Sequence, residues 1–118
     1  MDEWKRLEDF PDYEVSDHGH VRNRYSKRPL KPYIATNGFL AVTLRRDGRS
    51  HGRMIHLLVA REFVYPMPPY ADTPGHRNRD PYDNRAVNLI WVPRWIALQG
   101  GWNGSVDWFN PDESSDHG

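Results

Sequence analysis

The segment from Gly75 to Val92 constrains the fold of this chain more than any other. It opens on His76 after a turn-forming sequence, continues through a polar stretch rich in Arg, Asn, Asp and Pro, and ends in the apolar run 89–92. That run has the length and composition of a β-strand. A histidine placed before such a loop is a candidate general base, because neutral imidazole can accept a proton near pH 7. Taken alone, the pattern fits a loop histidine between two structural asparagines, Asn84 and Asn88, better than it fits a base.

Length and composition limit the class of protein. A chain of 118 residues predicts one domain, or one domain with a small appendage. The mean hydropathy is −0.87, but five Trp, six Tyr and four Phe supply the large side chains of a modest core. The absence of cysteine excludes a disulfide framework and a thiolate zinc site. No run approaches transmembrane length and no signal-peptide pattern is present, so we expect a cytoplasmic protein without membrane contact.

The formal net charge of zero conceals a strong segregation of charge along the chain. Ten Lys and Arg against one Asp give residues 18–61 a net charge of +9, whereas residues 1–17 carry −5 and residues 100–118 carry −4. A cationic middle is what a phosphate-binding surface requires. It is also what a solvated sheet face looks like, and charge alone leaves both interpretations open.

The first half of the chain reads as β-structure. Turn signals occur at residues 17–19 (Asp-His-Gly), at 37–38 (Asn-Gly) and in the charged run 45–49. The alternation of apolar and polar residues between them predicts a small antiparallel sheet with one buried face. Its strands are expected at residues 13–16, 20–25 and 39–44.

From Met54 the hydrophobic period changes to that of a helix. The apolar residues Ile55, Leu58, Val59 and Phe63 form one stripe, and the prolines at 66–69 end the helix. After the central segment, Pro93 predicts the first turn of a second helix of barely two turns, which Gly100-Gly101 would end. Trp91 is expected in the core.

Two stretches resemble one family. Residues 4–22 (Trp4 to Arg22, through Phe10-Pro-Asp-Tyr-Glu-Val-Ser-Asp-His-Gly) and 37–44 (Asn-Gly-Phe-Leu-Ala-Val-Thr-Leu) resemble the modular domain that precedes HNH motifs in phage-type homing endonucleases. Residues 55–63 (Ile-His-Leu-Leu-Val-Ala-Arg-Glu-Phe) and 76–92, with His76, Asn84 and Asn88, resemble the HNH part itself. The resemblance covers roughly residues 4–98.

This resemblance implies an α+β fold in which a small antiparallel sheet is followed by a helix and a ββα-metal (HNH-like) motif. The expected regions are a nuclease-associated, β-rich module at 1–50, the HNH-like ββα region at 51–100, and a partly disordered acidic, Trp-containing tail at 101–118. A phage-encoded protein acting in the cytoplasm of a bacterial host cell is implied as well.

The family's activity suggests roles for particular residues. Members bind double-stranded DNA and cut phosphodiester bonds with one divalent metal ion, so His76 is the expected catalytic base, with Asn84 and Asn88 as further site residues. From the residues alone, the two asparagines fit loop bracing through side-chain to backbone bonds better than metal contact. The cations expected to contact DNA are Arg22, Arg24, Lys27, Arg28, Lys31, Arg45, Arg46, Arg77 and Arg79.

The metal ligands depart from the family pattern. Members typically hold the ion through an acidic or amide residue just before the histidine and through an Asn or His in the terminal helix. Here these positions are Gly75 and approximately Ala97, which offer no donor atom. Asp80 and Asp83 are the candidate substitutes, and bound Mg²⁺ or Mn²⁺ would be held weakly.

Two functions therefore stand side by side. One is a metal-dependent nicking endonuclease of the phage homing type. The other is a catalytically lapsed HNH-fold module that binds DNA or a host protein, with the acidic tail as a possible protein-binding element. His56, beside the apolar stripe, is expected to be a packed structural histidine.

Overall fold

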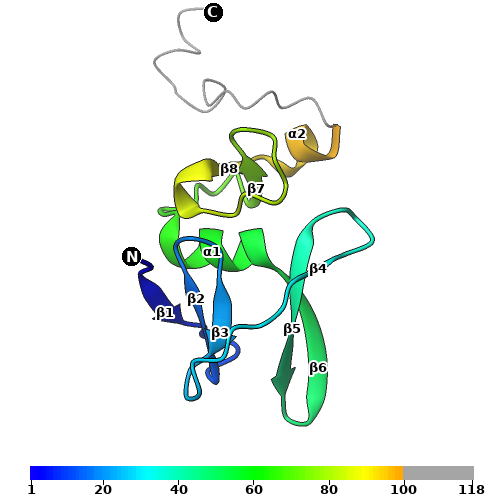
Figure 1. Cartoon of the computed structure of the whole chain (residues 1–118). Coiled ribbons are helices and arrows are strands. Elements are labelled where there is room, and N and C mark those ends of the chain that lie inside the picture. Colours follow the sequence, from blue (N-terminus) through cyan, green and yellow to red (C-terminus); the bar gives the residue numbers. More distant parts are fainter. Residues whose placement is uncertain (100–118) are drawn as a thin grey trace, which may run out of the picture.

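The computed structural model describes residues 1–99, with side chains through Ile96. The predicted tail at 101–118 and the predicted Gly100-Gly101 helix end lie outside the described residues. Figure 1 shows the elements in chain order. They are β1 (Trp4–Arg6), β2 (Tyr13–Ser16), β3 (Val21–Asn23), β4 (Tyr33–Ile34), β5 (Leu40–Arg46), β6 (Arg49–Met54), α1 (Ile55–Phe63), β7 (Thr73–His76), the 3₁₀ turn η1 (Ala86–Asn88), β8 (Leu89–Val92) and α2 (Arg94–Gln99).

The first three strands form an antiparallel sheet in the order β1-β2-β3. The predicted turn joins β2 to β3, and Gly19 sits there with φ +89°, which glycine adopts without steric cost. The third strand is shorter than the predicted 20–25. It ends at Asn23, because the Asn23 Oδ1 accepts hydrogen bonds from the backbone N–H groups of Tyr25 and Ser26, both at 2.9 Å, and turns the chain.

The next three strands form a second antiparallel sheet, β4-β5-β6. The predicted single sheet is thus two sheets, and β1, β4 and β6 were not expected. The β5–β6 turn is Asp47-Gly48, with φ +55° and +75°, the backbone that a tight hairpin requires. The charged run at 45–49 is therefore mostly strand. The Tyr13 hydroxyl joins the two sheets by accepting a hydrogen bond of 3.1 Å from the Arg45 N–H.

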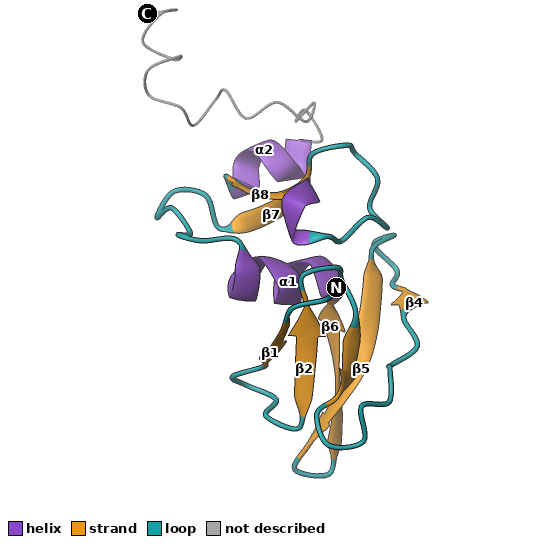
Figure 2. Cartoon of the chain, turned by 60° about the vertical axis from the view of Figure 1, so that its left-hand side comes forward, coloured by secondary structure: helices purple, strands orange, loops and turns teal. Residues whose placement is uncertain are grey.

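Helix α1 lies between the paired sheets and the β7–β8 hairpin, as Figures 1 and 2 show. It spans the predicted residues 55–63, and its apolar stripe enters the core with Ile55, Leu58 and Val59 each at most 7% exposed. The same cluster of buried side chains contains Val15 from β2, Leu44 from β5 and Trp91 from β8. One core therefore continues from the first strands to the last hairpin.

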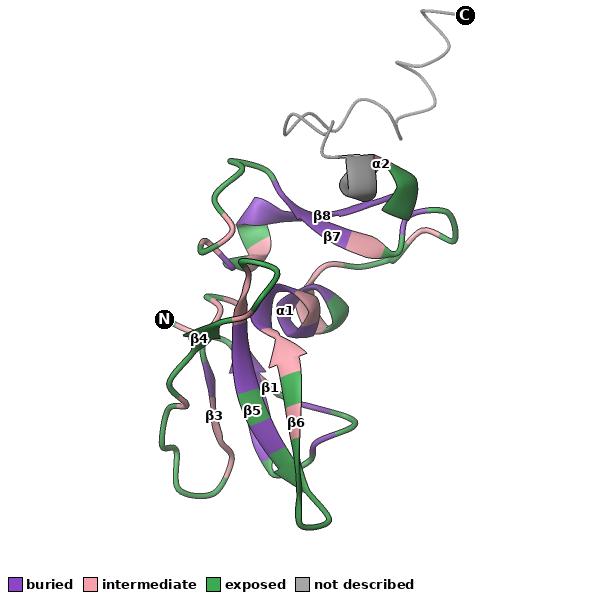
Figure 3. Cartoon of the chain, turned by 90° about the vertical axis from the view of Figure 1, so that its right-hand side faces the viewer, coloured by how far each residue is buried: buried purple, intermediate pink, exposed green. Residues whose placement is uncertain are grey.

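The C-terminal part has the predicted strand–strand–helix order. β7 and β8 pair antiparallel, with Gly75 opposite Ile90 and His76 opposite Leu89, and α2 begins at Arg94 directly after Pro93. Figure 3 shows β8 buried along its length, while the turn between β5 and β6 is exposed. Among residues 1–99 no helix is long and apolar enough to cross a membrane.

Candidate active site and cationic surface

His76 occupies the last position of β7 and is 6% exposed. Its Nε2 lies 2.7 Å from the Asn84 Oδ1. An amide oxygen only accepts hydrogen bonds, so in this arrangement Nε2 carries the proton and Nδ1 keeps the lone pair. Asn84 thereby fixes both the ring orientation and the tautomer of the histidine. This is the arrangement that a general base needs.

Two rings pack against His76. Phe39 stacks on it with ring centroids 5.8 Å apart and an interplanar angle of 14°, and the His56 ring lies 5.2 Å away. Burial, with a smaller contribution from the neighbouring His76, lowers the pKa of His56 to about 4. His56 is therefore neutral at pH 7. The Nδ1 of His56 is buried and has no hydrogen-bond partner among the described residues.

Asn88 braces the loop that follows β7. Its Oδ1 accepts from the Asn78 N–H at 3.1 Å, and its Nδ2 donates to the Asn78 Oδ1 at 3.0 Å and to the Asp83 carbonyl at 2.8 Å. The predicted bracing role thus describes the contacts of Asn88. Asn84, in contrast, bonds the histidine itself, so the two asparagines divide the work of holding the loop and orienting the ring.

The carboxylates near this loop already have hydrogen-bond or ion-pair partners. Asp83 receives two bonds of 2.8 Å from Arg85 and one of 2.9 Å from Asn78, and the Arg85 bonds hold the pKa of Asp83 at about 2. Asp80 Oδ1 accepts from the Tyr82 N–H at 2.9 Å, and Asp72 pairs with Arg94 at 3.1 Å.

The residues present do not fit a catalytic divalent cation at the histidine. Gly75, the residue before it, has no side chain to offer. Across the described 1–99 segment, no group of three His, Asp or Glu side chains is placed to hold a metal ion. Such a cation is held by several oxygen ligands, whereas the carboxylates of Asp80 and Asp83 accept hydrogen bonds from residues of their own loop.

The N-terminal hairpin backs the site. A Cβ placed on Gly19 would lie 3.1 Å from both the Cβ and the carbonyl oxygen of Asn84, so the turn approaches this residue as closely as a glycine permits. The Ala86 N–H also donates to the Asp17 carbonyl at 2.8 Å. The partner of His76 is thus held between its own loop and the β2–β3 turn, a contact that no local sequence pattern signals.

Several of the predicted DNA-binding cations have partners within the fold. Arg22 donates to Glu14 at 2.6 Å and lies 3.6 Å over the Trp4 ring, so its side chain is largely committed to the first sheet. Lys27 also bonds Glu14, at 3.1 Å. Arg24 reaches the Pro11 carbonyl at 3.3 Å, and Arg46 donates to the Asp9 carbonyl at 2.8 Å.

The remaining predicted cations are exposed. These are Arg28, Lys31, Arg45, Arg77 and Arg79. They come from the β3–β4 connection, the end of β5 and the loop after β7. Figure 1 shows that the β5–β6 turn and the β7–β8 pair lie toward opposite ends of the described fold, so these exposed positive charges are spread along the molecule.

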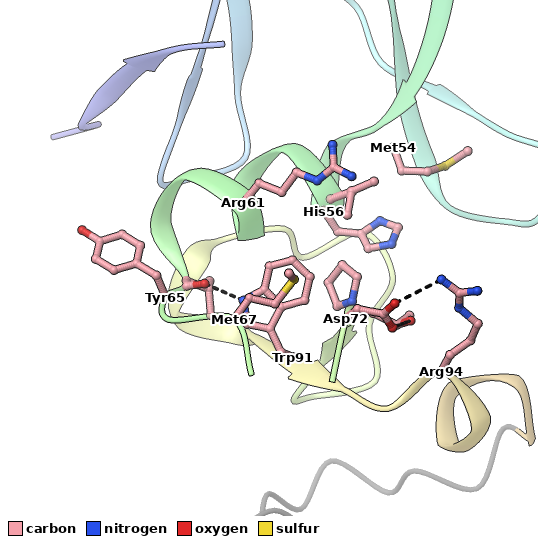
Figure 4. Close-up of a pocket in the computed structure, with 12 residues that line it drawn as sticks. Met54, His56, Arg61, Tyr65, Met67, Asp72, Trp91 and Arg94 are labelled. Carbon is pink, nitrogen blue, oxygen red and sulfur yellow. Dashed lines mark hydrogen bonds and ion pairs between the residues drawn. The ribbon is translucent and has the colours of Figure 1, made fainter. Parts of the chain in front are cut away.

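A cavity of about 610 Å³ is lined by residues of α1, β7 and β8 (Figure 4). Met54, Leu57, Met67 and Trp91 contribute apolar walls, and the Asp72–Arg94 ion pair borders it. His56 lines this cavity but His76 does not. This cavity is therefore not centred on the predicted base.

Comparisons with known proteins agree with this architecture. The NUMOD4 motif matches residues 2–45. The DNA endonuclease I-HmuI of Bacillus phage SP01 is 29% identical over 100 residues, covering 82% of this chain and 56% of that protein. Two uncharacterized HNH endonucleases of Acanthamoeba polyphaga mimivirus are 29% and 26% identical, covering 75% and 77% of this chain.

A solved structure is similar as well. The structure titled "DNA binding and cleavage by the HNH homing endonuclease I-HmuI" matches with a TM-score of 0.73 and 27% identity, over 83% of this chain and 56% of that one. The chain spans about half the length of I-HmuI and about a quarter of the mimivirus proteins. The predicted α+β class is confirmed. The chain therefore resembles phage-type HNH homing endonucleases in sequence and fold, with a NUMOD4 motif at residues 2–45 ahead of the HNH-like hairpin.

Proposed function

We propose that this chain binds double-stranded DNA and does not nick it at physiological magnesium concentrations. The observation that carries the proposal is the contrast at the end of β7. His76 is oriented by Asn84 at 2.7 Å, yet the residue before it is Gly75, which has no donor side chain. A base without a cation to stabilise the charge on the phosphate lacks the larger part of the chemistry.

The proposal of DNA binding rests on the exposed cations and on the similarity to HNH homing endonucleases. Phosphate contacts from Lys and Arg supply most of the sequence-independent affinity for DNA, and the five exposed cations named above can provide them. The NUMOD4 region and the structural similarity to I-HmuI, an endonuclease that binds and cleaves DNA, support the same partner.

The side chains of the site could still contact the phosphate backbone of bound DNA. The buried Asn84–His76 pair holds the imidazole in one orientation, and the rings of Phe39 and His56 pack against it. Such an imidazole can accept a hydrogen bond from water near a phosphate. That contact positions a molecule but does not by itself break a phosphodiester bond.

The direct test is binding and cutting measured on the same protein. Fluorescence anisotropy with a labelled duplex across a salt series should show affinity that falls steeply as salt rises. A supercoiled plasmid incubated with magnesium should stay uncut. No binding at low salt would reject DNA as the partner and favour a host protein. Affinity capture of host proteins on the immobilised chain could then identify that partner.

Nicking activity is the second candidate, because the orientation of His76 by Asn84 is what a nuclease would retain. Restoring ligands through Gly75→Asp with Ala97→Asn should then raise cleavage, and His76→Ala in that background should abolish it. Robust, chelator-sensitive, His76-dependent cutting by the unmodified protein would establish the nuclease instead. Mg²⁺ or Mn²⁺ would in that case be held by Asp80 or Asp83 after rearrangement, and Asp→Asn variants at each position would identify which.

A further inference from the structure

The loop after β7 holds one cationic residue in an unusual backbone conformation. Arg79 has φ +64°, in the left-handed region that glycine adopts freely and that residues with a Cβ adopt only against steric cost. A glycine would adopt this backbone conformation without the steric cost, yet the chain carries an arginine here.

The neighbouring residues fix this conformation from both sides. The Arg79 N–H donates to the His76 carbonyl at 3.0 Å. Asn78 is held by Asn88, and its Oδ1 in turn accepts from the Asp80 N–H at 2.9 Å. Backbone strain persists where the surroundings determine the conformation in this way, and such sites are frequently functional.

The side chain of Arg79 has no structural task within residues 1–99, where it is exposed and makes no hydrogen bond or ion pair. Lys27 provides the internal comparison. It has nearly the same φ, +61°, but its Nζ bonds the buried Glu14 at 3.1 Å. At position 27 the fold uses the side chain, whereas at position 79 the described fold does not.

We propose that Arg79 is a preorganised phosphate-contacting residue, whose rigid loop presents the guanidinium to the DNA backbone directly beside the His76 site. The inference rests on the proposed DNA binding and deepens it by naming a single contact. A guanidinium matches phosphate oxygens in two-pronged geometry, and a braced loop loses little freedom when it binds.

The experiment compares stability and binding in the same variants of the full chain. Arg79→Gly should raise the Tm by about 2–5 °C as the backbone relaxes, and should lower the slope of log affinity against log salt by about one. Arg79→Lys should keep the slope, because it keeps the charge. Lys27→Gly should raise the Tm less than Arg79→Gly does, because the same backbone relief is offset by the lost bond to Glu14.

Arg6→Gln controls for the loss of one exposed charge elsewhere, on β1, and should leave the slope unchanged. A slope that Arg79→Gly does not change, or a Tm that it does not raise, would overturn the inference while leaving DNA binding in place. Failure of the unmodified protein to bind DNA would instead remove the function on which the inference rests.

Discussion

Replacing Trp91 by alanine tests whether the HNH-like hairpin is part of the main core. Trp91 is 4% exposed, lies in the centre of β8, packs in the cluster with α1 and donates its indole N–H to the Val64 carbonyl. The change removes most of a buried aromatic side chain, leaves a cavity and orphans that carbonyl. Such substitutions cost about 3–5 kcal/mol, a large fraction of the roughly 5–15 kcal/mol that stabilises a typical domain.

Urea unfolding followed by far-UV circular dichroism measures this cost, because the signal does not depend on which tryptophan is removed. Trp95→Ala is the matched control: Trp95 is 63% exposed, so its loss should change the free energy of unfolding by less than about 0.5 kcal/mol. Trp91→Phe keeps the ring packing but loses the indole hydrogen bond and should cost about 1–3 kcal/mol. A cost below about 1 kcal/mol for Trp91→Ala would refute the shared core.

Three further predictions concern pH and the contact behind the site. Since the pKa of His56 is lowered to about 4, the unfolded chain binds the extra proton first, and stability should fall as pH falls from about 6.5 to 4; His56→Phe should flatten that part of a pH series of urea midpoints. The Arg85 bonds hold the pKa of Asp83 at about 2, so its contribution is present above 3.8 and lost as pH falls from there toward 2, and Asp83→Asn should remove the loss. Gly19→Ala should lower the free energy of unfolding by about 1–3 kcal/mol, because φ is +89° and the new methyl group meets Asn84. The amide chemical shifts of Asn84 should also move in nitrogen–proton NMR spectra, and unchanged shifts would contradict the contact.

The sequence predicts those parts of the fold that local chemistry determines. The apolar spacing of Ile55, Leu58 and Val59 locates α1, and the turns at Asp17–Gly19 and Asn37-Gly38 fall where glycine meets a positive φ. Strand β6 was not predicted, because apolar and polar residues alternate only weakly in its sequence, Arg-Ser-His-Gly-Arg-Met. It is also an edge strand that pairs only with β5.

Long-range contacts explain the rest. The division of the strands into two sheets depends on which strands pair across the chain, and no turn signal encodes that. A spacing of eight residues could not reveal that Asn84 bonds His76, nor that His56 lies beside them. One missed feature was within reach: the β2–β3 turn places Glu14 opposite Arg22, and cross-strand opposite charges predict the ion pair that occupies Arg22.

The close approach of Gly19 to Asn84 bears on how proteins of this kind can be recombined. A NUMOD4 region reads in sequence as an exchangeable cassette joined to an HNH part. Here the turn of that cassette touches the residue that orients His76, and strand β6 crosses the expected boundary at residue 50. A chimera that grafted a foreign first hairpin onto this HNH part would keep an ordered histidine only if the graft brought a glycine to the same turn.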